Sequence, residues 1–96
     1  MDVKEVIETW RPEILGYLKE MRDFYQEEDC RLVLRTLSAY SARASYMRNF
    51  ASRSGNEKIN RFRIDELDPF LMEVDRQFKI YSRLISANQF EFDLTK

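Results

Sequence analysis

The sequence between residues 33 and 51 reads VLRTLSAYSARASYMRNFA. Apolar side chains recur in this stretch at alternating spacings of four and three, a heptad pattern typical of a helix that packs lengthwise against other helices. The residues of this seam are Val33, Leu37, Tyr40, Ala44, Met47 and Ala51. The acidic run at 27–29 suits a helix N-terminus and Gly55 suits a helix end, so we predict a helix over about 29–53.

A related seam precedes this helix, carried by Ile14, Leu18, Met21 and Tyr25. Pro12 should start or kink a helix, so we predict a short N-terminal helix near 2–10 and a longer one over about 12–26. An alternative is that the 12–26 helix and its successor form one long rod, because no glycine or proline lies between Gly16 and Gly55. Extending the seam in steps of four would place Asp29 in the core, which favours a break near 26–29.

The C-terminal part of the chain predicts a loop over 54–67 and a third main helix after it. Asp68 followed by Pro69 fits an N-cap residue and the first position of a helix. The seam of this helix is carried by Leu67, Leu71, Val74, Phe78, Tyr81 and Ile85. Residues 89–96 alternate apolar and polar like a strand, but the chain offers no second strand, so we expect a docked or partly disordered tail.

These patterns together predict the fold class. Only two glycines and two prolines interrupt a chain of 96 residues, which favours an all-α protein. We predict an antiparallel three-helix bundle with coiled-coil-like heptad packing and a short N-terminal helix, with one domain over 1–88 and a tail over 89–96. The predicted core residues are Leu37, Tyr40, Met47, Leu71, Val74, Phe78 and Tyr81.

Composition argues against catalysis. The chain has no histidine, one cysteine and no glycine-rich phosphate loop, so we expect no enzyme, no cofactor and no metal site. The carboxylates of Asp65, Glu66 and Asp68 could ligate a hard cation, but a helix start explains them more simply. Cys30 is expected to be a buried thiol, with an intermolecular disulfide as the alternative. No apolar stretch is long enough for a membrane span, so we expect a cytoplasmic protein.

Charge is strongly segregated under a net charge of −1. Residues 31–63 hold eight basic side chains and one acidic one, while both flanking segments are acidic. One interpretation is that Arg31, Arg35, Arg43 and Arg48 pair with the acidic helices on either side. The alternative is an accessory nucleic-acid-binding subunit, in which Arg48, Arg53, Lys58, Arg61 and Arg63 contact phosphates and Phe62 stacks on a base.

Apolar side chains also exceed what the seams require, which points to an interface. The first candidates for a partner surface are Leu34, Tyr46, Phe50 and Ile80. The main functional hypothesis is therefore a protein-interaction module that forms a homodimer through apolar helix faces. The alternative is that the N-terminal helix and the aromatic tail cover these residues within one chain.

Overall fold

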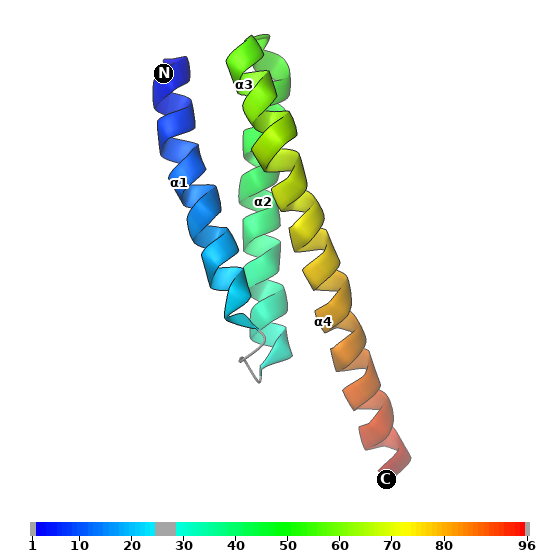
Figure 1. The fold of residues 1–96 in the computed structure, drawn as a ribbon. Helices are drawn as coiled ribbons and strands as arrows, with labels where there is room; N and C mark the ends of the chain where they lie inside the picture. The colour runs from blue at the N-terminus through cyan, green and yellow to red at the C-terminus, as the bar shows by residue number, and fades with distance from the viewer. Residues whose placement is uncertain (1, 25–28, 96) are drawn as a thin grey trace.

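A computed structural model describes residues 2–24 and 29–95, with side chains described as far as residue 87. The elements are α1 (Val3–Arg22), α2 (Cys30–Ser54), the short α3 (Glu57–Phe62), a π-helical turn η2 (Arg63–Leu67) and α4 (Asp68–Thr95). The described residues form helices and no strand, which confirms the all-α class. The chain turns back after α1 and again after α2, and α1, α2 and α4 pack together (Figure 1).

Helix α2 follows the prediction closely. Its start is capped by Asp29, whose carboxylate accepts hydrogen bonds from the backbone N–H groups of Arg31 and Leu32 at 3.0 and 3.2 Å. Its end is Gly55, whose φ of 67° is a left-handed conformation that glycine adopts without strain. All six seam residues are buried. Because α1 ends at Arg22 and α2 has its own capped start, the single-rod alternative is wrong.

Helix α1 is one continuous helix of 20 residues, so the predicted break at Pro12 is wrong. Proline removes one backbone hydrogen bond from a helix interior. Pro12 lies on the exposed side of α1, where water can solvate the carbonyl group that loses its partner. The apolar residues on either side of the proline therefore share one face, and Val6, Trp10 and Ile14 are all buried.

The predicted loop over 54–67 is also wrong, because residues 57–67 are helical. Asn56 caps α3 by accepting hydrogen bonds from the N–H groups of Lys58 and Ile59 at 2.9 and 3.1 Å. Ile59 and Phe62 are three residues apart and both buried, which gives the short helix an inward face. The segment looked like a loop in the sequence because it is rich in basic and polar residues, but the spacing of Ile59 and Phe62 is typical of a helix.

Asp68 is not the N-cap that the sequence predicts. Its backbone is helical, with φ −63° and ψ −44°, and its N–H donates to the carbonyl of Arg63, five residues back. The π-helical turn thus feeds directly into α4. Pro69, which has no N–H to donate, follows this turn, where the regular hydrogen-bond ladder is already altered. The helix continues to Thr95, so the backbone of 89–95 is helical rather than strand-like, and the boundary at residue 88 stays a prediction.

The buried face of α4 differs from its predicted seam. Leu67, Val74 and Tyr81 are buried as expected, but Phe78 is 38% exposed, and the core contains Phe70 at 1% exposure instead. A helix with two neighbours buries the arc between them. Phe70 lies in that arc, against Tyr17 of α1 and Tyr40 of α2. Phe78 lines a groove beside α2, and no residue of α1 lines that groove.

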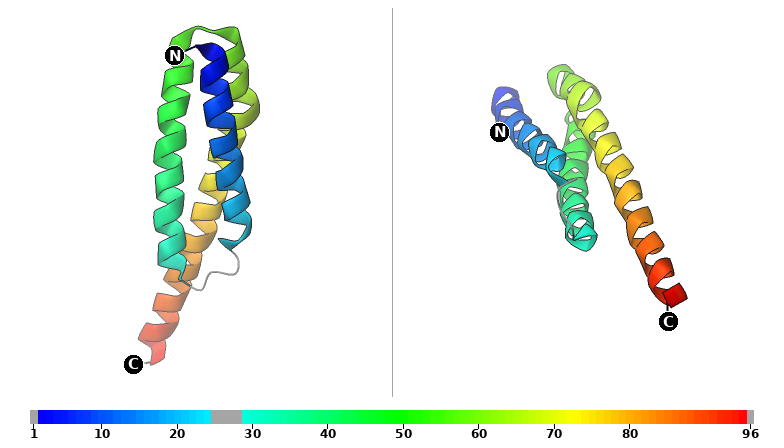
Figure 2. Two further views of the ribbon diagram at one scale, coloured as in Figure 1. Left: turned by 90° about the vertical axis from the view of Figure 1, so that its left-hand side faces the viewer. Right: turned by 60° about the horizontal axis from the view of Figure 1, so that its bottom comes forward.

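The molecule is elongated, with principal extents of 59 × 22 × 18 Å. Helix α4 continues past the first turn of α2, so its C-terminal half projects from the body of the molecule (Figure 1, Figure 2). The N-terminus of α1 and the short α3 lie together at the opposite end. None of the described helices is both long and apolar enough to cross a membrane.

Candidate interaction sites

Aromatic side chains join α1 to the other helices. The rings of Tyr17 and Tyr40 stack with centroids 4.3 Å apart, and Phe70 of α4 lies 6.0 Å from Tyr17. The Tyr40 hydroxyl donates a hydrogen bond to Glu20. The pKa of Tyr40 is raised, mainly because the hydroxyl is buried and also because of this hydrogen bond. The Tyr40 hydroxyl is already bound to Glu20 and the rings pack on one another, so this contact leaves no open binding site.

An ion pair reinforces the same contact. Arg43 of α2 donates to both carboxylate oxygens of Glu13 in α1, at 2.7 and 3.2 Å. Tyr17 donates a further hydrogen bond to Glu13 at 2.8 Å. The bond from Arg43 is the main cause that lowers the pKa of Glu13. The interpretation that Arg43 pairs with an acidic neighbouring helix is confirmed.

A second cluster ties α2 to α4. Arg48 donates to one carboxylate oxygen of Asp68 at 2.9 Å, and Arg63 donates to the other at 3.0 Å. Arg11 of α1 binds Glu66 through two nitrogens at 2.7 to 3.1 Å. The carboxylates that suggested a cation site are therefore bound by arginines. Asp65 completes the group with a longer contact of 3.9 Å to Arg61.

The residues predicted to bind nucleic acid differ in their burial and in their ion pairs. Phe62 is only 2% exposed and lies beneath the guanidinium of Arg11, 5.7 Å from its ring centroid, so the prediction that it stacks on a base is wrong. Arg48 and Arg63 are bound to Asp68. Arg53 and Lys58 are exposed and form no ion pair with the described residues.

Arg31 and Arg35 do not follow Arg43 and Arg48. Both are exposed on α2, and none of the ion pairs among the described residues includes them. Helix α2 contains no aspartate or glutamate. Positions 31, 35 and 53 fall within about 40° of one another at 100° per residue, so the three arginines lie on one outward face of α2. This face carries no acidic side chain from α2 itself.

The four predicted interface residues also separate. Tyr46 and Phe50 are 59% and 40% exposed and line one cleft on α2, together with Asn49, Arg53 and Ser54. Leu34 is half-buried against the core and lies about 160° from Phe50 around the helix. Ile80 is exposed on another helix, α4. The structure thus brings together Tyr46 and Phe50 but not the other two.

The structure contains a groove between α2 and α4 that the sequence did not predict. It has a volume of about 410 Å³. Helix α2 contributes only small side chains, and α4 contributes the larger apolar ones. The lining residues are Ser38, Ser41, Ala42, Leu71, Val74, Asp75 and Phe78. The row of serine and alanine outside the α2 seam was the available signal, but sequence could not show which helix would lie beside it.

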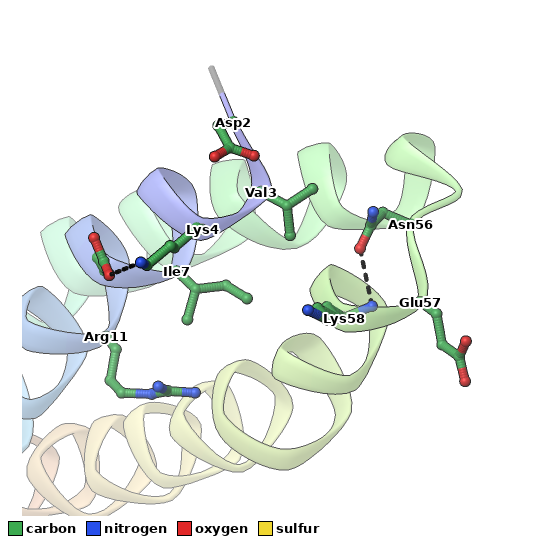
Figure 3. Close-up of a pocket in the computed structure, with 9 residues that line it drawn as sticks. Asp2, Val3, Lys4, Ile7, Arg11, Asn56, Glu57 and Lys58 are labelled. Carbon is green, nitrogen blue, oxygen red and sulfur yellow. Dashed lines mark hydrogen bonds and ion pairs between the residues drawn. The ribbon is translucent and has the colours of Figure 1, made fainter.

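A pocket of about 590 Å³ lies where α1 begins beside α3 (Figure 3). Val3 and Ile7 provide its apolar lining, and Lys58 and Arg11 approach from the sides. Lys4 pairs with Glu8, and Arg11 is held by Glu66, so much of the charge here is already paired. This arrangement favours a solvated end of the helices over a specific ligand site.

No protein-family model matches this sequence, and no curated protein or solved structure matches it either.

Proposed function

We propose that the protein is a non-enzymatic interaction module that forms a homodimer, with the groove between α2 and α4 as the contact surface. In this proposal α1, α2 and α4 form an antiparallel bundle with heptad packing. The observation that carries the proposal is the unoccupied groove beside Phe78. A predicted core residue is left 38% exposed there, next to a row of small side chains.

The distribution of α1 contacts explains why this side is open. Helix α1 covers the other side of the α2 and α4 pair, through Tyr17 against Tyr40 and Phe70. No described segment lies over the groove that α1 leaves open. The projecting part of α4 carries a further exposed apolar residue, Leu84. A helix that extends from a small body gains most of its stability from packing, which favours a partner along this side.

The shape of the groove favours a second copy as that partner. Leu71 and Phe78 form an apolar ridge on α4, and Ser38 and Ala42 form a low strip beside it on α2. A two-fold axis would place the ridge of each copy over the low strip of the other. Such a surface is self-complementary, which is what a symmetric dimer requires.

A matched pair of substitutions tests this surface. Ser38 and Ala39 are adjacent and exposed, but only Ser38 lines the groove. Ser38→Glu places a charge in the proposed contact, so we expect a monomer by size-exclusion chromatography with light scattering. Ala39→Glu adds the same charge about 100° around the helix and should leave the dimer intact. Equal masses for the two variants would contradict the proposal.

A further inference from the structure

We propose that the outward face of α2, next to the groove, binds single-stranded nucleic acid. The site is made of a stacking cleft at Tyr46 and Phe50 and of the exposed arginines Arg31, Arg35 and Arg53. It differs from the surface that the sequence suggested, since its aromatic residues are not Phe62. Its arginines and aromatic residues do not line the groove, but the two surfaces meet at Ala42, which lines the groove and lies between Arg31 and Arg35 around α2.

The cleft offers aromatic surface to a ligand. Tyr46, Asn49, Phe50 and Arg53 line a hollow of about 390 Å³ together with Ser54. Tyr46 is 59% exposed, because it lies outside the buried face of α2. Aromatic side chains at the surface next to arginine are the elements on which unpaired bases stack.

The two rings are held in place from the protein side. The guanidinium of Arg43 lies 5.6 Å from the centroid of Tyr46, and Arg43 is itself fixed by Glu13. Phe50 makes an edge contact with buried Trp10, with centroids 5.4 Å apart. A pre-positioned ring loses little conformational freedom when a base stacks on it.

Charge extends the site along the helix. Arg31 and Arg53 are 22 positions apart, which corresponds to about 33 Å at 1.5 Å per residue. Arg35 lies between them on the same face, and α2 carries no acidic residue. These exposed arginines form no ion pair among the described residues, so their guanidinium groups are free to bind phosphate.

The side chains between the arginines favour a nucleic acid over an acidic peptide. They are polar at Ser45 and Asn49, and neither residue lines the apolar groove beside Phe78. A phosphate backbone can approach such a surface closely. A duplex would leave the exposed rings unused because its bases are already stacked, so the favoured ligand is a single strand.

Fluorescence anisotropy with labelled 15-nucleotide oligothymidylate and oligouridylate tests the proposal. Three phosphate contacts on a single strand predict a salt slope near −2, which is about a 20-fold loss of affinity between 50 and 200 mM salt. Arg35→Gln combined with Arg53→Gln should reduce the slope to about −0.7. The control is Lys19→Gln combined with Arg83→Gln, which removes the same charge from other helices and should leave the slope unchanged.

The aromatic part is tested separately. Tyr46→Ala should weaken binding about five-fold or more, while Tyr46→Phe keeps the ring and the affinity. Phe78→Gln should release the dimer and leave oligonucleotide binding intact. Ala39→Glu, which should preserve the dimer, should weaken oligonucleotide binding because it places an acid about 40° around the helix from Arg35 and Arg53.

Three results would overturn the inference. One is the absence of binding to either oligonucleotide at 50 mM salt. Another is Tyr46→Ala binding as well as the wild-type protein. The third is displacement of the oligonucleotide by polyglutamate at equal charge concentration, which would identify an acidic peptide as the ligand. Binding of the DNA strand alone, or of the RNA strand alone, still supports the site.

Discussion

Arg48 of α2 and Asp68 at the start of α4 face each other, with Nε 2.9 Å from Oδ1. Arg63 donates to the other carboxylate oxygen from the π-helical turn. One carboxylate thus joins three elements of the chain. Its role is to tie α4 to α2, whereas a helix cap would act only on the backbone of its own helix.

Substitutions at Asp68 distinguish these two roles. Asp68→Ser retains a good capping side chain but loses both charge-assisted hydrogen bonds, so we expect the free energy of unfolding to fall by about 2 kcal/mol in urea denaturation. Arg48 is half exposed, so most of this loss is attributed to Arg63. An unchanged stability for Asp68→Ser would favour the cap.

The two glycines predict opposite effects of alanine. Gly55 has a φ of 67°, and a Cβ added there would meet no atom within 4 Å, so Gly55→Ala should cost about 1 kcal/mol through backbone strain alone. Gly16 lies in the interior of α1, also without a neighbour within 4 Å, so Gly16→Ala should add about 0.5–1 kcal/mol. Thermal unfolding followed by circular dichroism measures both. The same sign of change for both variants would contradict the assigned conformations.

The contact between Arg43 and Glu13 predicts a pH dependence. The pKa of Glu13 is lowered from its ordinary value of 4.5 by its bond to Arg43, so the folded state favours the ionised form. The contribution of Glu13 to stability is therefore fully present above pH 4.5 and is lost as pH falls through the lower pKa of the folded state. Glu13→Gln should be less stable by about 1 kcal/mol at pH 7. The difference from wild type should shrink in acid, and a constant difference from pH 7 to pH 3 would contradict this role.

Phe62 and Tyr46 should respond differently to loss of the ring. Phe62 lies in the core, so Phe62→Leu should lower the free energy of unfolding by about 1–2 kcal/mol and leave oligonucleotide affinity unchanged. Tyr46→Leu changes an exposed residue and should alter stability by about 0.5 kcal/mol at most. Chemical denaturation of the two variants measures the contrast. A larger loss of stability for Tyr46→Leu than for Phe62→Leu would contradict the assignment of Phe62 to the core and of Tyr46 to the surface.

The extent of prediction from sequence differs between the helices. The α2 seam, its acidic start and Gly55 all agree with one another, and both ends were predicted to within a residue. Pro12 misled because a proline lowers the stability of a helix interior without always ending the helix, and α1 continues through it with Trp10 and Ile14 buried on one face. Asp68 misled because aspartate before proline is a frequent helix start, and no local pattern announces a π-helical turn that joins two helices.

The candidate sites depended on packing that sequence does not contain. The heptad at Phe78 is real as a pattern, but the position of α1 decides which side of α4 is covered. Arg48 and Arg53 are both arginines of the basic segment, yet among the described residues Arg48 pairs with a carboxylate, that of Asp68, and Arg53 does not. The groove, the paired arginines and the exposed ones are therefore properties of the helix arrangement.

Sedimentation equilibrium of the wild-type protein over a wide range of micromolar concentrations tests the proposed self-association most directly. We predict a mass of about twice the chain mass of 11.6 kDa, and a return to one chain mass for Ser38→Glu with its helical content unchanged. A wild-type protein that sediments with the mass of a single chain at every concentration would contradict the account.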